Sequence, residues 1–497
     1  MLFNSYSFIA FFAIVLLLHN LPFSWRAKKM NLLLASYLFY AAWNPPFVLL
    51  LWLSTAIDFF VGKKLFLEQV RWKRKALLWV SLVGNLGMLA FFKYGAFLLQ
   101  NFVSLVNALG FDYHPAAPSI ILPIGISFYT FQTLSYTLDM YRRNTVPVKS
   151  LLDFSLFVTF LPQLVAGPIV RPGELIPQFH RERKTRASQL VNGLFLLSLG
   201  LFMKVVMADT MLSGASDSVF NAGRPVLTLD AWLGVLAFSG QIFFDFAGYS
   251  TCAIGIAMSL GFTLPDNFKY PYAAIGFSDF WRRWHITLSS WLRDYLYIPL
   301  GGNRSGAART YINLMLTMLL GGLWHGASWT FVAWGALHGL YLCVERLFRR
   351  RTTETDVLPL VEETKEVAPA YVHASFVPSF FYNRAVRMFL AAMITFFFVN
   401  LAWVFFRAAD FSTAWSLLSS MFGFDKGGAP ILTTIDIIKV SVVTVLLVTT
   451  HWLMRNTSVS AVLRKTSWWI TGLAWAFMLI MLVLSQKSSD SFIYFQF

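Results

Sequence analysis

Charged residues are scarce in this sequence, and cysteine is nearly absent. Of its 497 residues, 13% are charged and two are cysteines, whereas 57% are hydrophobic. Cys252 and Cys343 both lie inside apolar runs, so a disulfide framework is not expected. So few charges, together with a mean hydropathy of +0.60, exclude an ordinary soluble globule and indicate an integral membrane protein.

Sequence motifs of several large protein classes are also missing. The chain has no Walker A sequence, no dinucleotide-binding glycine fingerprint and no Gly-x-Ser-x-Gly elbow. It has no cluster of histidine and cysteine with metal-ligand spacing. These absences argue against ATP-driven transport, nicotinamide redox chemistry, zinc hydrolysis and conventional serine esterases. Neither a metal site nor a bound cofactor is predicted.

The formal net charge of +16 is explained by membrane topology better than by a nucleic-acid partner. Lysine and arginine gather in short clusters between apolar runs, as the positive-inside rule expects. The cluster Arg26, Lys28 and Lys29 follows the first apolar run and places the N-terminus outside the cytoplasm. That run, Tyr6 to Leu18, lacks a basic n-region and a cleavage site, so we expect a retained first span.

The remaining apolar runs predict an all-α protein with roughly 11 to 13 membrane segments. The last of these runs are Ala385 to Phe406, a shorter one near Phe411 to Phe422, Val440 to Met454 and Trp468 to Leu484. The composition divides the chain into N-terminal helices, a core, a polar cytoplasmic loop rich in acidic residues, and C-terminal helices: 1–110, 111–348, 349–383 and 384–497. Within the core, Pro123, Gly125 and the segment 160–172 predict irregular backbone. Membranes accept such backbone only where protein or water satisfies its polar groups, so these segments indicate a cavity wall.

The most informative stretch runs from Ser278 to Val344 and contains two histidines, His285 and His325. At helical pitch its first part has an apolar stripe with His285 at its edge, formed by Trp281, Trp284, Leu288, Trp291, Leu292 and Tyr295. Arg282 and Arg293 lie largely away from that stripe. The pattern predicts a helix at the membrane boundary or along a wet cavity.

The second histidine is predicted to lie deep in the bilayer. If Arg309 marks the interface, His325 lies roughly 24 Å further along a helix, inside a hydrocarbon core of about 30 Å. An intramembrane histidine is costly, so by default it faces a cavity and has a function there. The alternative is a neutral ring that hydrogen-bonds two helices together. His338, thirteen residues beyond, is predicted to be structural.

A separate polar series lies on the apolar run from Leu229 to Phe262. Gln241, Asp245 and Tyr249 are spaced by four residues along one helical face. A buried carboxylate at Asp245 needs a partner. A salt bridge that fastens two helices and a direct chemical role both remain open for it.

Paired histidines beside a buried cavity are suited to acyl transfer. A neutral imidazole can take the proton of an attacking hydroxyl and return it to a leaving group. The same reaction needs stabilisation of a tetrahedral oxyanion. His325 would be the base, and His285 would orient it or stabilise developing charge.

Several segments, in order, resemble the membrane-bound O-acyltransferase family, and most closely its bacterial alginate O-acetyltransferase branch. The resemblance rests on Phe280 to His285 (FWRRWH), Trp291 to Tyr297 (WLRDYLY), Leu300 to Arg304 (LGGNR), Gly321 to Gly326 (GGLWHG), Leu122 to Tyr129 (LPIGISFY), Ala166 to Pro168 (AGP) and Phe244 to Phe246 (FDF). One position departs from that branch, because Tyr249-Ser250-Thr251 stands where the branch has Tyr-Ser-Asp.

The resemblance implies a multi-helix bundle with a central tunnel through the inner membrane of a bacterium. It implies acetyl-CoA as the cytoplasmic donor, an exported polysaccharide as the acceptor outside, and a periplasmic acetyltransferase partner protein. It assigns the essential histidine to His325 and its polar partner to His285. The residues expected along the tunnel are Trp324, Arg282, Trp291, Asp294, Tyr297, Gln241 and Asp245.

Two alternatives remain open from the sequence. The same fold could carry a D-alanyl or fatty acyl group to another acceptor. A small-solute transporter with the histidines as a proton relay also fits broken helices and intramembrane charges. The lack of internal repeats counts against the transporter.

Overall fold

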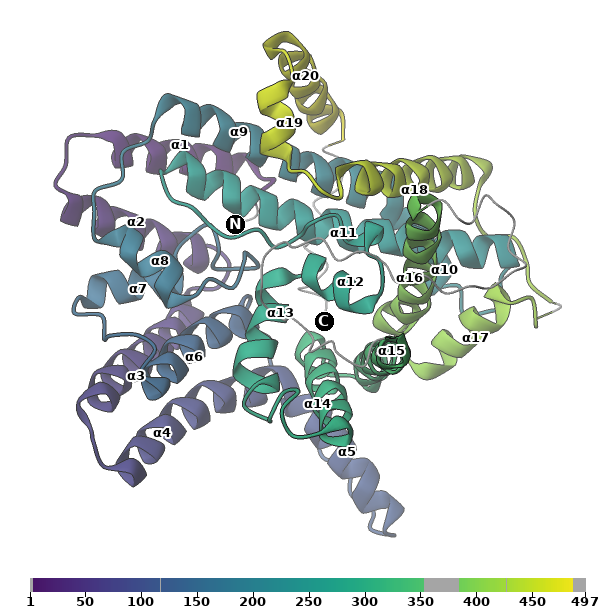
Figure 1. Cartoon of the computed structure of the whole chain (residues 1–497), viewed down its shortest axis with the longest axis horizontal. Helices are drawn as coiled ribbons and strands as arrows, with labels where there is room; N and C mark the ends of the chain where they lie inside the picture. Colours follow the sequence, from purple (N-terminus) through teal and green to yellow (C-terminus); the bar gives the residue numbers. More distant parts are fainter. Residues whose placement is uncertain (1–2, 117, 353–383, 426, 486–497) are drawn as a thin grey trace.

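The computed structural model describes residues 3–116, 118–352, 384–425 and 427–485, and it confirms the predicted all-α class (Figure 1). The first half of the chain forms short and medium helices: α1 (Tyr6–Asn20), α2 (Trp25–Ala41), η1 (Pro45–Phe47), α3 (Val48–Leu67), α4 (Arg71–Leu89), η2 (Ala90–Tyr94), α5 (Gly95–Ala108), α6 (Ile126–Arg142), α7 (Leu151–Thr159) and α8 (Pro172–Phe179).

The second half contains the longest helices and the segment with both histidines. Its elements are α9 (Ala187–Leu201), η3 (Phe202–Leu212), α10 (Ser213–Phe220), α11 (Thr228–Ser259), η4 (Pro271–Ala273), α12 (Phe277–Arg283), α13 (Ile286–Leu292), η5 (Arg293–Tyr297), α14 (Ala307–His325), α15 (Trp329–Thr352), α16 (Arg384–Arg407), α17 (Phe411–Met421), α18 (Thr434–Met454), α19 (Val459–Lys465) and α20 (Trp468–Leu484). Most of the predicted polar loop, residues 353–383, lies outside the described residues.

Six helices of the described residues are long and apolar enough to cross a membrane. They cover Pro45–Leu67, Arg71–Ala108, Ala187–Phe220, Thr228–Ser259, Arg384–Arg407 and Thr434–Met454. Two shorter apolar helices, α1 and α20, accompany them. The protein is therefore a multi-pass membrane protein. The other predicted segments form shorter or more polar helices, such as α2 and α14.

Irregular buried backbone occurs at both places where the sequence predicts it. Gly125 has a φ of 77° just before α6, and a Cβ at this position would lie 2.7 Å from the carbonyl oxygen of Leu164. Only glycine fits such a contact in that conformation. Residues 160–170 form buried turns between α7 and α8. These two segments pack against each other and form one wall of the core.

The predicted helix through His285 is interrupted at that residue, which is a correction to the single stripe expected from the sequence. His285 has a φ of 43° and separates α12 from α13. Asn267 causes the break, because its carbonyl oxygen accepts from the Ile286 N–H at 2.9 Å and its side chain accepts from the Thr287 N–H at 3.3 Å. The break turns the imidazole towards the interior, where it is fully buried.

Helix α11 crosses the middle of the molecule and packs along α9 and η3 (Figure 1). Asp245 of α11 pairs with Lys204 of η3, with 2.5 Å between the carboxylate oxygen and Nζ. Lys204 also pairs with Asp209 at 2.8 Å. The structure therefore gives Asp245 the helix-fastening ion pair that was one of its two predicted roles.

Helices α14 and α15 cross at glycines. A Cβ at Gly322 would lie 2.3 Å from the carbonyl oxygen of Phe331, and a Cβ at Gly335 would lie 2.3 Å from that of Met318. Real Cβ atoms do not approach this closely, so any side chain here would push the two helices apart.

We therefore expect Gly335→Leu to lower the midpoint of thermal unfolding in detergent by about 1–3 degrees, since overpacking costs roughly 1–3 kcal/mol. Gly472→Leu is the matched control, because a Cβ at Gly472 meets nothing within 4 Å. Equal midpoints for the two variants would show that the crossing does not depend on close contact.

Candidate functional site

Two histidines from separate elements meet in the interior. His325 is the last residue of α14, and His285 lies between α12 and α13. Their ring centroids are 6.3 Å apart, and the exposed fractions of the two residues are 2% and 0%. The structure thus brings together the two residues that the sequence singled out, although 40 positions separate His285 from His325 in the chain.

Asn267 fixes the orientation of His285. The His285 Nδ1 lies 3.2 Å from the Asn267 side-chain oxygen, which also accepts from the Thr287 hydroxyl at 2.9 Å. Because that oxygen can only accept, Nδ1 carries the proton and Nε2 keeps its lone pair. Among the described residues, His285 Nε2 has no hydrogen-bond partner. The imidazole therefore presents a lone pair in the interior.

Aromatic rings surround the pair. The Trp324 centroid lies 5.0 Å from that of His325 and 5.8 Å from that of His285. Trp334 and Phe406 lie 5.0 and 5.3 Å from His325. These rings exclude bulk water, so electrostatic interactions inside the site are stronger than they would be in solvent.

A narrow cavity of about 40 Å³ reaches His325 from one side. It is lined by the irregular segment from Leu122 to Phe128, together with Lys93, Val165, Trp324 and His325. Lys93 Nζ donates to the carbonyl oxygens of Trp324 and His325 at 2.8 and 2.9 Å. The predicted cavity wall at Pro123 and Gly125 is thus present beside the histidine.

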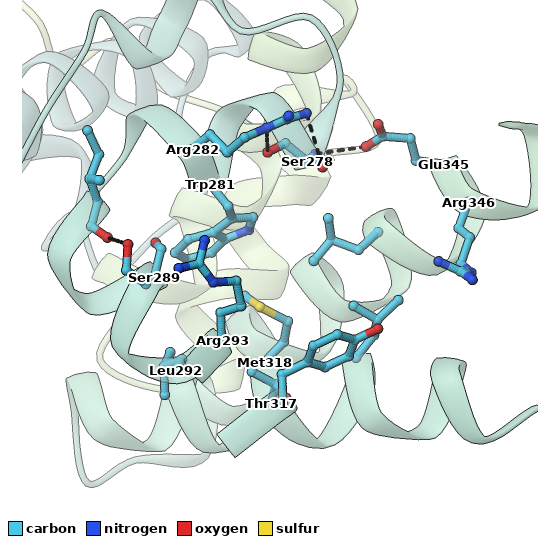
Figure 2. A pocket seen from close by; sticks show the side chains of 15 residues that line it. Ser278, Trp281, Arg282, Ser289, Leu292, Arg293, Thr317, Met318, Glu345 and Arg346 are labelled. Atoms are coloured by element: carbon cyan, nitrogen blue, oxygen red, sulfur yellow. Dashed lines mark hydrogen bonds between the residues drawn. The ribbon is translucent and has the colours of Figure 1, made fainter. Parts of the chain in front are cut away.

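A larger cavity of about 350 Å³ lies between α12, α13, η5, α14 and α15 (Figure 2). Three arginines line it, Arg282, Arg293 and Arg346. Figure 2 shows Trp281 and Arg293 in its middle, with Ser289 and Arg346 on opposite sides. The rest of the lining is mainly serine and apolar: Ser278, Ile286, Ser289, Ser290, Leu292, Leu314, Thr317, Met318 and Leu342, with Tyr297 and Glu345.

Carboxylate and amide partners position two of these arginines. Arg293 Nε lies 2.6 Å from an Asp294 oxygen, and Arg171 pairs with the same carboxylate at 2.5 Å. Burial alone would raise the pKa of Asp294, but hydrogen bonding from Arg293 and the positive charge of Arg171 outweigh it and lower that pKa. Asp294 is therefore ionised near neutral pH. On α15, Arg346 donates to the Asn303 side-chain oxygen at 3.3 Å.

Trp281 and Trp334 separate the larger cavity from His325. Trp281 lines the cavity, and its centroid lies 5.7 Å from that of Trp334, which in turn contacts His325. His338 packs against the same two rings at 5.1 and 4.8 Å. Neither His338 nitrogen has a hydrogen-bond partner among the described residues.

The residues expected along a tunnel take different places. Arg282 and Tyr297 line the larger cavity, Trp324 lines the smaller one, and Asp294 holds Arg293. Trp291 stacks on Phe131 with centroids 3.9 Å apart and donates to its carbonyl oxygen at 2.9 Å. Gln241 and Asp245 line neither cavity. Their place in a tunnel remains a prediction.

Sequence reasoning missed Lys93, Asn267 and Arg346 as members of the site. Lys93 had a visible signal, because it interrupts an apolar run. Asn267 had none, since a polar residue in a loop is ordinary. In the described part of the chain, no group of three or more histidine, cysteine, aspartate or glutamate residues could hold a metal ion.

Comparisons with known proteins identify relatives of this chain. The family model described as "MBOAT, membrane-bound O-acyltransferase family" matches residues 145–360. "Probable alginate O-acetylase AlgI" of Azotobacter vinelandii is 38% identical over 424 residues, which is 85% of this chain and 78% of that protein.

Related proteins with other acceptors are similar as well. "Peptidoglycan O-acetyltransferase" of Helicobacter pylori is 38% identical over 427 residues, covering 80% of this chain and 74% of its own length. "Teichoic acid D-alanyltransferase" of Bacillus subtilis is 27% identical over 262 residues, covering 50% and 64%. The chain is an O-acyltransferase and belongs to the membrane-bound O-acyltransferase family.

Proposed function

We propose that this protein moves an acetyl group from cytoplasmic acetyl-CoA across the inner membrane of a bacterium to hydroxyls of an exported polysaccharide. The observation that carries the proposal is the histidine pair. His325 lines the narrow cavity, and the rings of Trp281 and Trp334 separate it from the larger cavity. The arginine-lined cavity suits an anionic donor, and the narrow cavity suits a neutral hydroxyl.

The positive-inside rule assigns the two cavities to opposite sides. Arg346 of the larger cavity lies three residues before the basic cluster Arg349, Arg350 and Arg351, so this end of α15 faces the cytoplasm. The basic cluster from Arg71 to Lys75 marks the cytoplasmic end of α4, and Lys93 of the narrow cavity lies further along the same continuous helix. The narrow cavity therefore opens on the outer side, as an exported acceptor requires.

The lining chemistry of the larger cavity matches coenzyme A. Guanidinium groups bind phosphates through paired charge-assisted hydrogen bonds. The larger cavity has three guanidinium groups, those of Arg282, Arg293 and Arg346. Leu292 and Met318 offer apolar surface to the pantetheine chain. The thioester would then approach the histidines past Trp281 and Trp334.

The space beside His325 favours an acetyl group over larger or charged acyl groups. The narrow cavity holds about 40 Å³, which is too little for a fatty acyl chain. Lys93 lines it, and a D-alanyl group would bring a second positive charge next to that amine. An acetyl group meets neither obstacle.

The reaction then needs only atoms that the site and substrates supply. The acceptor hydroxyl gives its proton to the His325 imidazole as its oxygen bonds to the thioester carbon, and the carbonyl electron pair moves to oxygen. The tetrahedral intermediate collapses, the carbon–sulfur bond breaks, and the thiolate of coenzyme A takes the proton from the imidazolium. The Nε2 lone pair of His285, which has no partner among the described residues, accepts a hydrogen bond from the bound acceptor hydroxyl and so orients it. The acceptor is the polysaccharide itself or a hydroxyl of a periplasmic acetyltransferase partner protein.

The test uses purified protein in nanodiscs with acetyl-labelled acetyl-CoA. Mannuronate oligosaccharides and peptidoglycan fragments serve as acceptors in separate arms. We expect His325-dependent cleavage of the thioester, and label on one acceptor class. Binding or passage of label with an intact thioester would instead support a transporter.

The arginine cavity gives a quantitative prediction. We expect Arg346→Gln to raise the KM for acetyl-CoA about tenfold or more, since a charge-assisted hydrogen bond contributes roughly 1.5–3 kcal/mol, with little change in kcat. Arg309→Gln on α14 is the matched control, because this arginine is exposed and lines neither cavity. A wild-type KM in Arg346→Gln would remove the larger cavity as the donor site.

A further inference from the structure

Lys93 is an unusual residue for its position. It lies within the continuous helix Arg71–Ala108. Only 17% of the most apolar stretch of this helix is buried inside the protein, so most of that stretch is on the outer surface of the bundle. Residues Ala90–Tyr94 form a π-helical turn there. π-Turns cost stability and occur frequently at functional sites, because they redirect side chains. The turn directs Lys93 and Tyr94 towards α14.

Both residues bind the C-terminus of α14. Tyr94 donates its hydroxyl to the Leu323 carbonyl oxygen at 2.8 Å, and Lys93 Nζ donates to those of Trp324 and His325. These three consecutive carbonyls lack partners within a helix that ends at His325. The negative end of the helix dipole also lies there and favours a positive charge on Lys93. Lys93 and Tyr94 thus share one structural task.

Lys93 differs from Tyr94 in its access to a cavity. It lines the narrow cavity with His325, whereas Tyr94 does not. An ammonium group has three N–H donors, and the described residues occupy two of them. The third N–H has no partner among the described residues, and Lys93 lines the same cavity as the His325 imidazole.

We propose that Lys93 stabilises the oxyanion of the acyl transfer. This inference rests on the proposed function. While His325 takes the acceptor proton, the carbonyl oxygen of the thioester gains the electron pair and the negative charge, and the Lys93 ammonium donates a hydrogen bond to it. The charge then returns to the carbonyl as the carbon–sulfur bond breaks. Two carbonyls hold the amine in place, so little reorganisation is needed during the reaction.

The experiment compares Lys93→Met with Tyr94→Phe in nanodiscs. It uses acetyl-CoA as the donor and, as the acceptor, whichever of the mannuronate oligosaccharides or peptidoglycan fragments the wild-type protein acetylates. Each variant removes contacts to the end of α14, but only Lys93→Met removes a donor from the cavity. We expect Lys93→Met to lower kcat about 10²–10³-fold with KM changed less than about threefold, the loss typical of a missing oxyanion donor. Tyr94→Phe should lower kcat by less than about threefold, and Lys93→Arg should recover part of the rate.

Thermal unfolding of each variant separates a catalytic from a structural role. If Lys93→Met does not fold, Lys93→Gln replaces it, because its amide can still donate to a carbonyl but has no charge, and the same loss of kcat is expected. Equal kcat losses in the Lys93 and Tyr94 variants would overturn the inference and leave α14 capping as the whole role. A wild-type protein without His325-dependent thioester cleavage would instead overturn the proposed function.

Discussion

Replacing His325 by alanine is expected to lower acetyl transfer about 10³-fold or more while the protein remains folded in the membrane. A general base contributes roughly 10²–10⁴-fold to a rate. His325 is the histidine that lines the narrow cavity, so no other imidazole there can take over the acceptor proton. The rate is measured as thioester cleavage and labelled acceptor in nanodiscs.

The matched control for this variant is His338→Ala. His338 is buried like His325 and contacts the same Trp334 ring, but it lines neither cavity. We expect it to lower thermal stability and to leave kcat within about threefold, which separates the loss of packing from the loss of a base. Transfer at the wild-type rate by folded His325→Ala would remove His325 from the chemistry.

Replacing Lys204 by methionine is expected to destabilise the protein by about 3–5 kcal/mol, because it leaves Asp245 and Asp209 without their cation in the interior. Asp245 is only 1% exposed and lies on α11, the helix at the centre of the molecule. We therefore expect low yields of folded protein and a midpoint of thermal unfolding lowered by about 3–5 degrees.

Lys269→Met is the matched control for Lys204→Met. Lys269 pairs with Asp266 at 3.9 Å, and the side chains of both residues are more than half exposed. Exposed pairs contribute little to stability, so this variant should unfold at the wild-type temperature. A Lys204→Met protein that unfolds there too would mean that the buried ion pair does not fasten α11.

Three of the C-terminal helices could be predicted almost to the residue, whereas α18 begins at Thr434, six residues before the predicted run Val440 to Met454. The apolar runs Ala385 to Phe406 and Trp468 to Leu484 correspond to α16 and α20, and Phe411 to Phe422 corresponds to α17. Their boundaries coincide with charged or polar residues, and no distant contact competes with the local preference for a helix.

The break at His285 could not be predicted, because its cause is distant in the chain. The run from Phe277 to Tyr297 has helical periodicity. However, Asn267 accepts hydrogen bonds from the backbone N–H groups of the two residues that follow His285, and these bonds replace the helical ones. A periodic pattern reports which face is buried. It does not report a tertiary contact that interrupts the helix.

The candidate site was predictable in its chemistry and only partly in its geometry. His285 and His325 stood out because imidazoles are rare among apolar residues, whereas their meeting depends on how α12 and α14 pack. Lys93 carries a charge in an apolar run, but its partners are the carbonyls at the end of α14, which no sequence pattern identifies.

The central claim is that the two cavities open on opposite sides of the membrane, one lined by His325 and the other separated from His325 by Trp281 and Trp334, and cysteine labelling tests it most directly. The chain has two cysteines, Cys252 and Cys343, so a Cys252→Ser, Cys343→Ser background is readily made. In it, Ser290→Cys probes the larger cavity and Ser127→Cys the narrow one. A membrane-impermeant thiol reagent is applied to right-side-out and to inverted vesicles.

We predict that Ser290→Cys reacts only from the cytoplasmic side and is protected by acetyl-CoA, and that Ser127→Cys reacts only from the outer side. Reaction of both cysteines from the same side would contradict the account, because the donor and the acceptor could then not meet across the membrane.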